Sequence, residues 1–214
     1  MGICLALDTA GSEHALVLLE FDRVLAEDSW PRTRGAGDPP ILSRVQSLLD
    51  RAGRTRGHLE AVAAGRGPGS FTGLRVGLAI ASGIAYAGGL PLYLVDSLAV
   101  LRAQSPLTGA ALRDAGRGEC FAWRPGIEPV RVPGAELRGW LRPQERVIVD
   151  PPGRLAGWTG DPAPEIPATE RLPLPRALAQ VAIEALRSKK PVRYHEVRPL
   201  YVQPAAAEER KASQ

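Results

Sequence analysis

The feature that most constrains the fold is a glycine-rich turn, Gly-Arg-Gly-Pro-Gly-Ser-Phe-Thr-Gly-Leu-Arg-Val-Gly, at residues 65–77. Gly67 and Gly69 flank Pro68, which predicts a sharp turn between a strand and the helix that follows it. Ser70 is a good N-cap residue for that helix. Because a helix N-terminus after glycines attracts anions, the first interpretation is a phosphate-binding loop.

That interpretation fails two tests of sequence. A P-loop needs a Lys followed by Ser or Thr after its last glycine, and this segment has neither in that place. A dinucleotide fingerprint needs Gly or Ala where Ser70 stands and an acidic residue about 20 positions later, and both are missing. The turn alone therefore gives only weak support to nucleotide binding.

The helix predicted over residues 70–87 carries a row of small residues. They recur every fourth position and so share one face: Gly73, Gly77, Ala81 and Ala85. Either the helix packs tightly on its own sheet, or this face meets a second subunit. The apolar run Val76–Leu90 is too short and too rich in glycine for a membrane span, which needs about 20 residues.

Composition narrows the class of protein without naming a function. The 214 residues are 44% hydrophobic, enough for one large domain or two small ones. The net charge of +4 comes with arginines spread along the chain, which favours a solvated surface over a nucleic-acid patch. Two cysteines, Cys4 and Cys120, make no disulfide framework, and no leader pattern opens the chain, so we expect a cytoplasmic protein.

The first half of the chain predicts the order β-β-β-α-β-α-β-α. The helix before the glycine-rich turn begins at Pro39 or Pro40, is capped by Asp38 and reaches Arg51. The helix after the last strand begins at Asp96 or Ser97 and ends at Leu101. The predicted strands are 3–7, 15–21, 24–30, 59–64 and 92–95, of which the first three form an antiparallel meander.

A boundary near residue 105 separates a second part with weaker signals. A hairpin is predicted from strands 107–112 and 120–123, a strand at 146–149 and a helix from Leu174 or Pro175. The domains predicted are an N-terminal lobe at 1–105, a smaller C-terminal lobe at 106–204 and a flexible tail at 205–214.

Together these features resemble the TsaB family of bacterial tRNA threonylcarbamoyladenosine biosynthesis proteins. The resemblance rests on the element order and on four segments: Ala6–Ala10, Gly67–Arg75, Asp96–Leu98 and Pro199–Val202. It implies an α/β, actin/Hsp70-like (ASKHA) fold, with two ribonuclease H-like lobes on mixed sheets and a reduced second lobe. The family usually shows Asp-Ala-Arg and then Glu-Val-Tyr in its second half; this chain departs there, with Gly116 in place of the Arg and Cys120-Phe121 in place of Val-Tyr.

The resemblance also implies a function. TsaB-like proteins are non-catalytic partners of a TsaD-type paralogue, which transfers a threonylcarbamoyl group to adenosine 37 of tRNAs reading ANN codons. A TsaE-type ATPase joins the complex, and tRNA meets the chain only through it. We expect no cofactor in the isolated chain, with ATP or ADP a candidate at the interface of the complex, no membrane contact, and a homodimer in isolation. The expected partner interface is Gly67, Pro68, Gly69, Ser70, Phe71, Thr72, Gly73, Arg75, Gly77 and Ala81.

The residues also bear on catalysis by this chain. The paralogue holds a metal with two histidines four positions apart on its first long helix, whereas the corresponding helix here has none. His14, His58 and His195 are scattered, and neither HExxH nor GxSxG occurs. Asp8 and Thr9 are the candidates for a vestigial phosphate loop, although Asp8 can equally cap its own turn. The alternative function is a stand-alone metal-dependent ATPase or M22-type peptidase.

Overall fold

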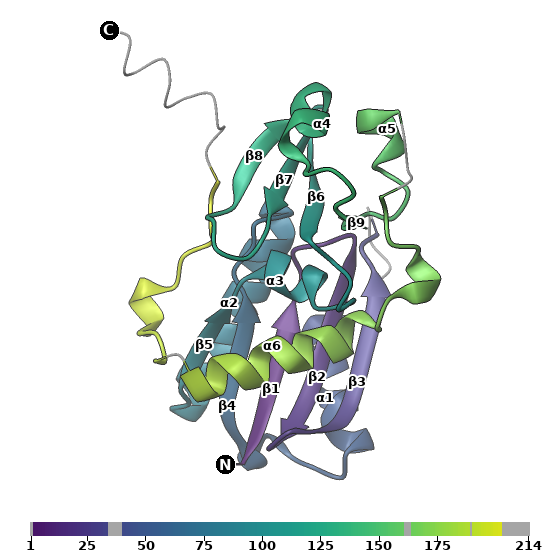
Figure 1. The fold of residues 1–214 in the computed structure, drawn as a ribbon. Helices are drawn as coiled ribbons and strands as arrows, with labels where there is room; N and C mark the ends of the chain where they lie inside the picture. Colours follow the sequence, from purple (N-terminus) through teal and green to yellow (C-terminus); the bar gives the residue numbers. More distant parts are fainter. Residues whose placement is uncertain (1, 34–39, 161–163, 189, 203–214) are drawn as a thin grey trace, which may run out of the picture.

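Two mixed β-sheets, one in each lobe, organise the chain in a computed structural model that describes residues 2–33, 40–160, 164–188 and 190–202 (Figure 1). The first sheet has the order β3-β2-β1-β4-β5, and the second has the order β8-β7-β6-β9. The strands of the first are β1 (Ile3–Asp8), β2 (Glu13–Glu20), β3 (Arg23–Pro31), β4 (Leu59–Gly65) and β5 (Leu92–Val95). Those of the second are β6 (Ala110–Gly116), β7 (Glu119–Trp123), β8 (Val130–Pro133) and β9 (Val147–Asp150).

Strand β1 is the centre of the first lobe because both of its faces are buried. It pairs antiparallel with β2 and parallel with β4, so the meander and the parallel part of the sheet meet at this strand. Its alternate residues enter two separate cores, Leu5 and Leu7 on one side, Cys4 and Ala6 on the other. A sheet buried on both faces needs helices on both faces.

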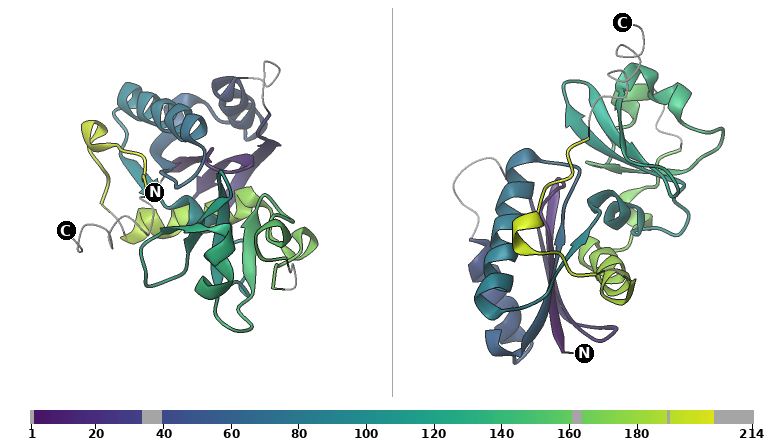
Figure 2. Two further views of the ribbon diagram at one scale, coloured as in Figure 1. Left: turned by 90° about the horizontal axis from the view of Figure 1, so that it is seen from above. Right: turned by 90° about the vertical axis from the view of Figure 1, so that its left-hand side faces the viewer.

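Three helices supply that cover (Figures 1 and 2). Helices α1 (Ile41–Arg51) and α2 (Phe71–Gly88) pack their buried residues into the core that contains Leu5 and Leu7. Helix α6 (Leu174–Ser188) covers the opposite face, with its alanines and leucines against the core that contains Cys4 and Ala6.

The place of α6 corrects the predicted domain boundary. The sequence assigned 106–204 to the second lobe, but α6 and the segment after it return to the first. Val192 bridges to Leu92 at the edge of β5, and the N–H of Leu200 donates to the carbonyl oxygen of Arg66 at 2.7 Å. The physical reason is that the sheet face opposite α1 and α2 needs an apolar helix, and α6 provides it.

The second lobe packs a smaller core under its sheet. Helix α3 (Ser97–Arg102) lies between the lobes, where Leu98 and Leu101 pack against Ala111 and Ile148. The remaining elements are short: α4 (Leu137–Trp140), α5 (Ala156–Thr159) and single 3-10 turns at Arg56–His58, Gly134–Glu136, Ala168–Glu170 and Tyr194–Glu196.

The predicted elements of the first lobe are confirmed, with ends that shift by one or two residues. The hairpin is also confirmed, although β6 begins three residues later than predicted. Strand β8 and helices α4 and α5 were not predicted. The predicted cap Asp38 and the predicted tail lie outside the described residues; α1 follows Pro40 with no side-chain cap.

Candidate functional site

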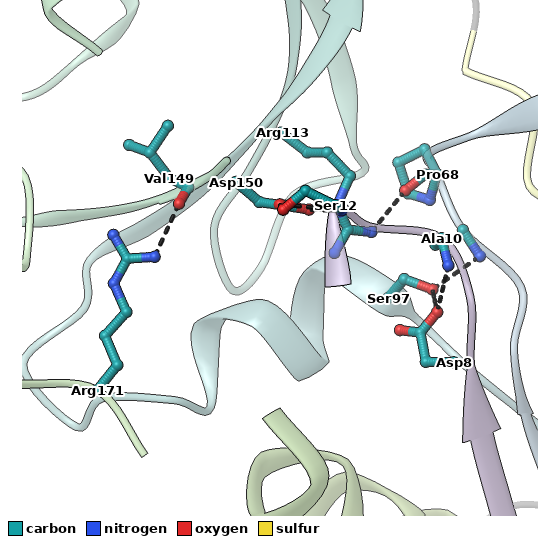
Figure 3. Close-up of polar contacts among 10 residues, drawn as sticks. Asp8, Ala10, Ser12, Pro68, Ser97, Arg113, Val149, Asp150 and Arg171 are labelled. Atoms are coloured by element: carbon teal, nitrogen blue, oxygen red, sulfur yellow. Dashed lines mark hydrogen bonds and ion pairs between the residues drawn. The ribbon is translucent and has the colours of Figure 1, made fainter. Parts of the chain in front are cut away.

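The glycine-rich turn joins β4 to α2 and presses on the turn between β1 and β2 (Figure 3). Gly67 has a φ of +98°, and its peptide bond to Pro68 is cis. A Cβ on Gly69 would lie 2.3 Å from the carbonyl oxygen of Ala10. The N–H of Ser70 donates to that same oxygen at 2.8 Å. The two turns therefore form one packed unit at the end of the sheet.

Ser70 is the N-cap of α2, as predicted. Its hydroxyl oxygen accepts a hydrogen bond from the N–H of Gly73 at 3.2 Å, and the helix begins at Phe71.

The row of small residues on α2 packs inside the first lobe. The hydroxyl of Thr9 donates to the carbonyl oxygen of Gly73 at 2.7 Å, and a Cβ on Gly77 would lie 2.1 Å from the same hydroxyl oxygen. Ala81 and Ala85 are fully buried in the core. The expectation that this face meets a second subunit is therefore wrong, because β1 and its turn already cover it.

Asp8 supports the glycine-rich turn from below. Its Oδ1 accepts hydrogen bonds from the N–H of Ala10 at 2.9 Å and from the hydroxyl of Ser97 at 3.0 Å. The oxygen of Ser97 in turn accepts from the N–H of Gly67 at 3.1 Å. The alternative that Asp8 caps its own turn is thus confirmed, and the same carboxyl links the turn to the start of α3.

The environment of Asp8 disfavours its charge. The residue is 3% exposed, and its Oδ2 is buried with no hydrogen-bond partner in the part of the chain that the structure describes. Burial raises the pKa of Asp8 above its ordinary value, against the opposing charge of Arg113 and the two hydrogen bonds. A carboxyl held in this way is a poor ligand for a divalent metal ion, which binds the charged carboxylate.

A buried ion pair of the second lobe contacts both turns of this packed unit in the first lobe (Figure 3). Arg113 on β6 and Asp150 on β9 are paired neighbours in the second sheet, and Arg113 Nε lies 2.6 Å from Asp150 Oδ2. Arg113 Nη1 also donates to the carbonyl oxygen of Pro68 at 3.0 Å. Asp150 accepts hydrogen bonds from both the N–H and the hydroxyl of Ser12. Two strand ends of one lobe therefore hold two turns of the other.

The ion pair keeps Asp150 charged. Burial acts to raise the pKa of Asp150, but the guanidinium of Arg113 and the hydrogen bonds from Ser12 outweigh it, so the pKa is lowered. Asp8 at the end of β1 and Asp150 at the end of β9 are thus two buried carboxyls whose pKa values shift in opposite directions.

A cleft of about 470 Å³ opens beside the ion pair, lined by both lobes and by the end of the described chain. Predicted residues Gly69, Ser70 and Phe71 line it, with Ser12 and Tyr201. Asp8 and Thr9 do not, because their side chains are directed into the packed unit. The two residues predicted as a vestigial phosphate loop therefore offer neither the carboxyl nor the hydroxyl group to a phosphate in this cleft.

Another face of α2 is exposed and apolar. Its residues follow the spacing i, i+4, i+7, i+11, i+14 and are Thr72, Val76, Ala79, Gly83 and Tyr86, hereafter the exposed face of α2. Val76 is 44% exposed and Tyr86 73% exposed, and a Cβ on Gly83 would meet nothing within 4 Å.

This exposure is unusual for so apolar a helix. By length and composition alone, the 18 residues of α2 could cross a membrane, with a mean hydropathy of 1.2 and 28% of them buried. The helix instead lies on the first sheet through Leu74 and Leu78. Its exposed apolar residues form a patch of the kind that marks interaction surfaces.

The segment after α6 borders the exposed face of α2 at both ends (Figure 2). The hydroxyl of Tyr194 donates to the carbonyl oxygen of Leu90 at 2.8 Å, and its ring meets that of Tyr86 edge-on at 5.6 Å. At the other end, the rings of Tyr201 and Phe71 lie 6.2 Å apart. Residues more than a hundred positions apart in sequence thus frame one surface.

The described residues show no metal-binding cluster and no paired histidines. No group of three or more His, Cys, Asp and Glu residues there is placed to hold a metal ion. His14, His58 and His195 lie in different parts of the first lobe. Burial raises the pKa of both Cys4 and Cys120 to about 12, so neither thiol is a ready nucleophile.

Sequence reasoning did not find Arg113 and Asp150. The available signal was a charged residue in each of two otherwise apolar strands, 110–113 and 147–150. A charge inside such a run needs a partner, but the sequence does not say which.

Residues 40–189 match the family model described as "TsaD: tRNA N6-adenosine threonylcarbamoyltransferase". The chain belongs to the TsaD family. Within it, the chain is TsaB-like, or YeaZ-like, in its relatives and in its fold.

Three comparisons show what the chain is similar to in sequence and in fold. The tRNA threonylcarbamoyladenosine biosynthesis protein TsaB of Escherichia coli is 35% identical over 123 residues, which cover 55% of this chain and 52% of that protein. An uncharacterized protein of Mycobacterium tuberculosis is 29% identical over 200 residues, 82% of this chain and 94% of its own. The structure of YeaZ from Pseudomonas aeruginosa has a TM-score of 0.74 at 23% identity and covers 94% of this chain and 100% of that one.

The match to the Escherichia coli protein thus spans about half of its length. The fold is the predicted one, an α/β actin/Hsp70-like fold with two lobes on mixed sheets. In this frame the ion pair of the second sheet borders the cleft, and its two side chains hydrogen-bond to turns of the first lobe.

Proposed function

We propose that the chain takes part in tRNA threonylcarbamoyladenosine biosynthesis as a non-catalytic partner of a TsaD-type threonylcarbamoyl transferase. The observation that carries the proposal is the exposed face of α2, an apolar surface on a helix in which only 28% of the residues are buried. Burial of such a surface against another chain is favourable, at about 25 cal/mol per Å² of apolar area.

The shape of this face suits another helix. Ala79 and Gly83 in its middle let a second backbone approach closely, while Val76 and Tyr86 supply apolar area on either side. Tyrosine is enriched among the residues that dominate binding energy. A paralogue of the same fold would offer an equivalent helix, and so would a second copy of this chain, so we propose that the isolated chain forms a homodimer through the same face.

Two features favour a partner without catalysis over the alternative, a metal-dependent ATPase or M22-type peptidase. The described residues hold no metal-binding group. The best candidate carboxyl, Asp8, is engaged by Ala10 and Ser97, and its pKa is raised by burial.

Contact with tRNA would come through the complex. Many arginines of this chain pair with acidic neighbours, which reduces the charge that is free for phosphate contacts. The ion pairs include Arg44–Asp28, Arg54–Glu20, Arg124–Glu145, Arg146–Glu170, Arg154–Asp114 and Arg171–Glu165.

The finer parts of the proposal follow the family resemblance. They are modification of adenosine 37 in tRNAs reading ANN codons, entry of a TsaE-type ATPase into the complex, and a cytoplasmic location. We propose no cofactor for the isolated chain, with ATP or ADP held at the interface of the assembled complex.

Gly83→Glu tests the proposal directly. Gly83 is exposed and lies within α2, so Glu improves helix propensity by a few tenths of a kcal/mol or more and leaves folding intact. Its charge would be buried against a partner, so we expect affinity for the TsaD-type paralogue to fall about a hundredfold. The measurement is a titration of the purified paralogue, with thermal unfolding alongside.

The matched control is Gly139→Glu, a helical glycine of the second lobe that also has nothing near an added Cβ. It should bind like the unchanged protein. Equal affinity for both variants would contradict docking through α2. Separately, ATP or peptide hydrolysis by the pure chain that disappears in Asp8→Ala would overturn the non-catalytic role.

A further inference from the structure

We infer that Arg113 is a positioning residue that fixes the N-terminal end of the exposed face of α2 by tying the glycine-rich turn to the second lobe. The inference rests on the proposed function and adds to it a link between the arrangement of the lobes and the docking surface. Arg113 does not lie on that surface; it acts through the carbonyl group of Pro68.

The first step is the direction of the two side chains. Arg113 and Asp150 are register partners on β6 and β9, and both are at least nine-tenths buried. An ion pair that stabilised only the second sheet would need no hydrogen bond to the first lobe. Here Arg113 reaches Pro68 and Asp150 reaches Ser12, so each side chain crosses to a different turn of the first lobe (Figure 3).

The second step is the energetics of the pair. A buried ion pair is often no more stabilising than apolar residues of the same volume, because the two charges lose their hydration. Its retention is better explained by the geometry that it imposes. Arg113 has donors in a fixed planar fork, which lets one side chain hold a carboxylate and a carbonyl group at the same time.

The third step is what the turn holds in place. Pro68 stands two residues before Ser70, the cap of α2. Phe71 follows at once, 57% exposed, with the guanidinium of Arg75 3.7 Å from the centre of its ring. A shift of the turn would therefore move Phe71 first, whereas Tyr86 at the far end of the helix is held by Tyr194.

Other contacts anchor the turn from within the first lobe. The carbonyl oxygen of Ala10 accepts from Ser70, and the hydroxyl of Ser97 accepts from Gly67. The bond from Arg113 comes instead from the second lobe. A change in the angle between the lobes would thus reach the glycine-rich turn directly through Arg113, whereas the link from Ser12 to Asp150 reaches that turn only through Ala10.

The test uses the full chain and a double variant, Arg113→Met with Asp150→Leu. Removing both charges avoids an unpaired buried carboxylate, so we expect an unchanged midpoint of thermal unfolding. We expect the affinity for the TsaD-type paralogue to fall about tenfold, within the range by which residues outside an interface modulate binding. Amide hydrogen exchange in residues 67–72 should become faster, while exchange in residues 78–86 stays the same.

Two further variants separate positioning from simple stability. Arg113→Lys keeps the charge beside Asp150 but lacks the fork that also reaches Pro68, so affinity should still fall; this variant also decides the question if the double variant does not fold. Ser12→Ala removes an interlobe hydrogen bond without touching Pro68, and affinity should not change. Full affinity in Arg113→Lys, or a loss in Ser12→Ala equal to that in Arg113→Lys, would overturn the inference.

Gly83→Glu distinguishes the failure of this inference from the failure of the proposed function. If Gly83→Glu abolishes binding while the Arg113 variants bind normally, the docking face stands and the positioning role of Arg113 is wrong. If Gly83→Glu binds normally, the proposed function is wrong, and the inference that rests on it is overturned as well.

Discussion

Two rows of small residues run along α2, and the structure treats them in opposite ways. Gly77 and Ala81 are buried, and a Cβ added to Gly77 would overlap the hydroxyl oxygen of Thr9 at 2.1 Å. Ala79 and Gly83 face solvent, and nothing lies within 4 Å of a Cβ added to Gly83. The two rows look alike in sequence. Small residues at helical spacing therefore indicate that another backbone can approach the helix closely, but they do not indicate whether that backbone belongs to the same chain.

The difference also relocates the expected interface. Of the predicted interface residues, Phe71, Thr72 and Arg75 are exposed, whereas Gly77 and Ala81 are inside the lobe. The apolar surface that remains open to a partner is therefore the exposed face of α2. It lies on another side of the helix from the row that contains Gly77 and Ala81.

The largest expected effect comes from filling the buried row. Gly77→Leu places a side chain where Thr9 lies, so we expect a loss of about 3 kcal/mol or more in the free energy of unfolding. Chemical denaturation measures it. Gly83→Leu is the matched change on the other row and should be neutral or stabilise by up to about 1 kcal/mol through helix propensity. If both variants unfold alike, the two rows do not differ as described.

The pH dependence of stability tests the role of Asp8, whose carboxyl is buried near the N-terminal end of α2. Because burial raises the folded-state pKa of Asp8, its contribution to stability is fully present below its unfolded pKa of about 3.9 and is lost as pH rises through the folded pKa. Asp8→Asn cannot ionise, so its stability relative to the unchanged protein should improve as the pH is raised from 4 to 8.

Unfolding followed across that pH range makes the measurement. The control is Asp22→Asn, where the carboxyl is mostly exposed and pairs with Arg187 at the surface. A relative stability of Asp8→Asn that falls as pH rises would show that Asp8 is stabilised as a carboxylate, contrary to its burial. Affinity for the paralogue should be the same in both variants, since neither residue lies on the exposed face of α2.

The smallest expected effect is at the point where both rows begin. Ser70→Ala removes the cap of α2 and should cost about 1 kcal/mol in unfolding free energy. Ser70→Asp keeps an oxygen acceptor near the helix N-terminus and should retain most of that stability. Thermal unfolding of the three proteins makes the comparison, and equal stability of Ala and Ser at this position would mean that contacts with Ala10 alone set the start of α2.

Sequence by itself determined the elements whose signals are local. The meander, the strands around the glycine-rich turn, the cap at Ser70 and the two longest helices follow from alternation, helical spacing and turn residues that neighbours in sequence can express. Strand β8 and helices α4 and α5 escaped because they are short and lie in a stretch rich in proline. The equally short β5 and β9 were found because they are apolar runs.

Tertiary structure decided what covers each face. Helical spacing placed Gly77 and Ala81 together but could not choose between Thr9 and a second chain, because periodicity describes one helix and not its neighbours. The return of α6 to the first sheet, and the meeting of Arg113 with Pro68, join residues that lie far apart along the chain. Such contacts depend on how the elements pack in space, and a single sequence records only that these residues need partners.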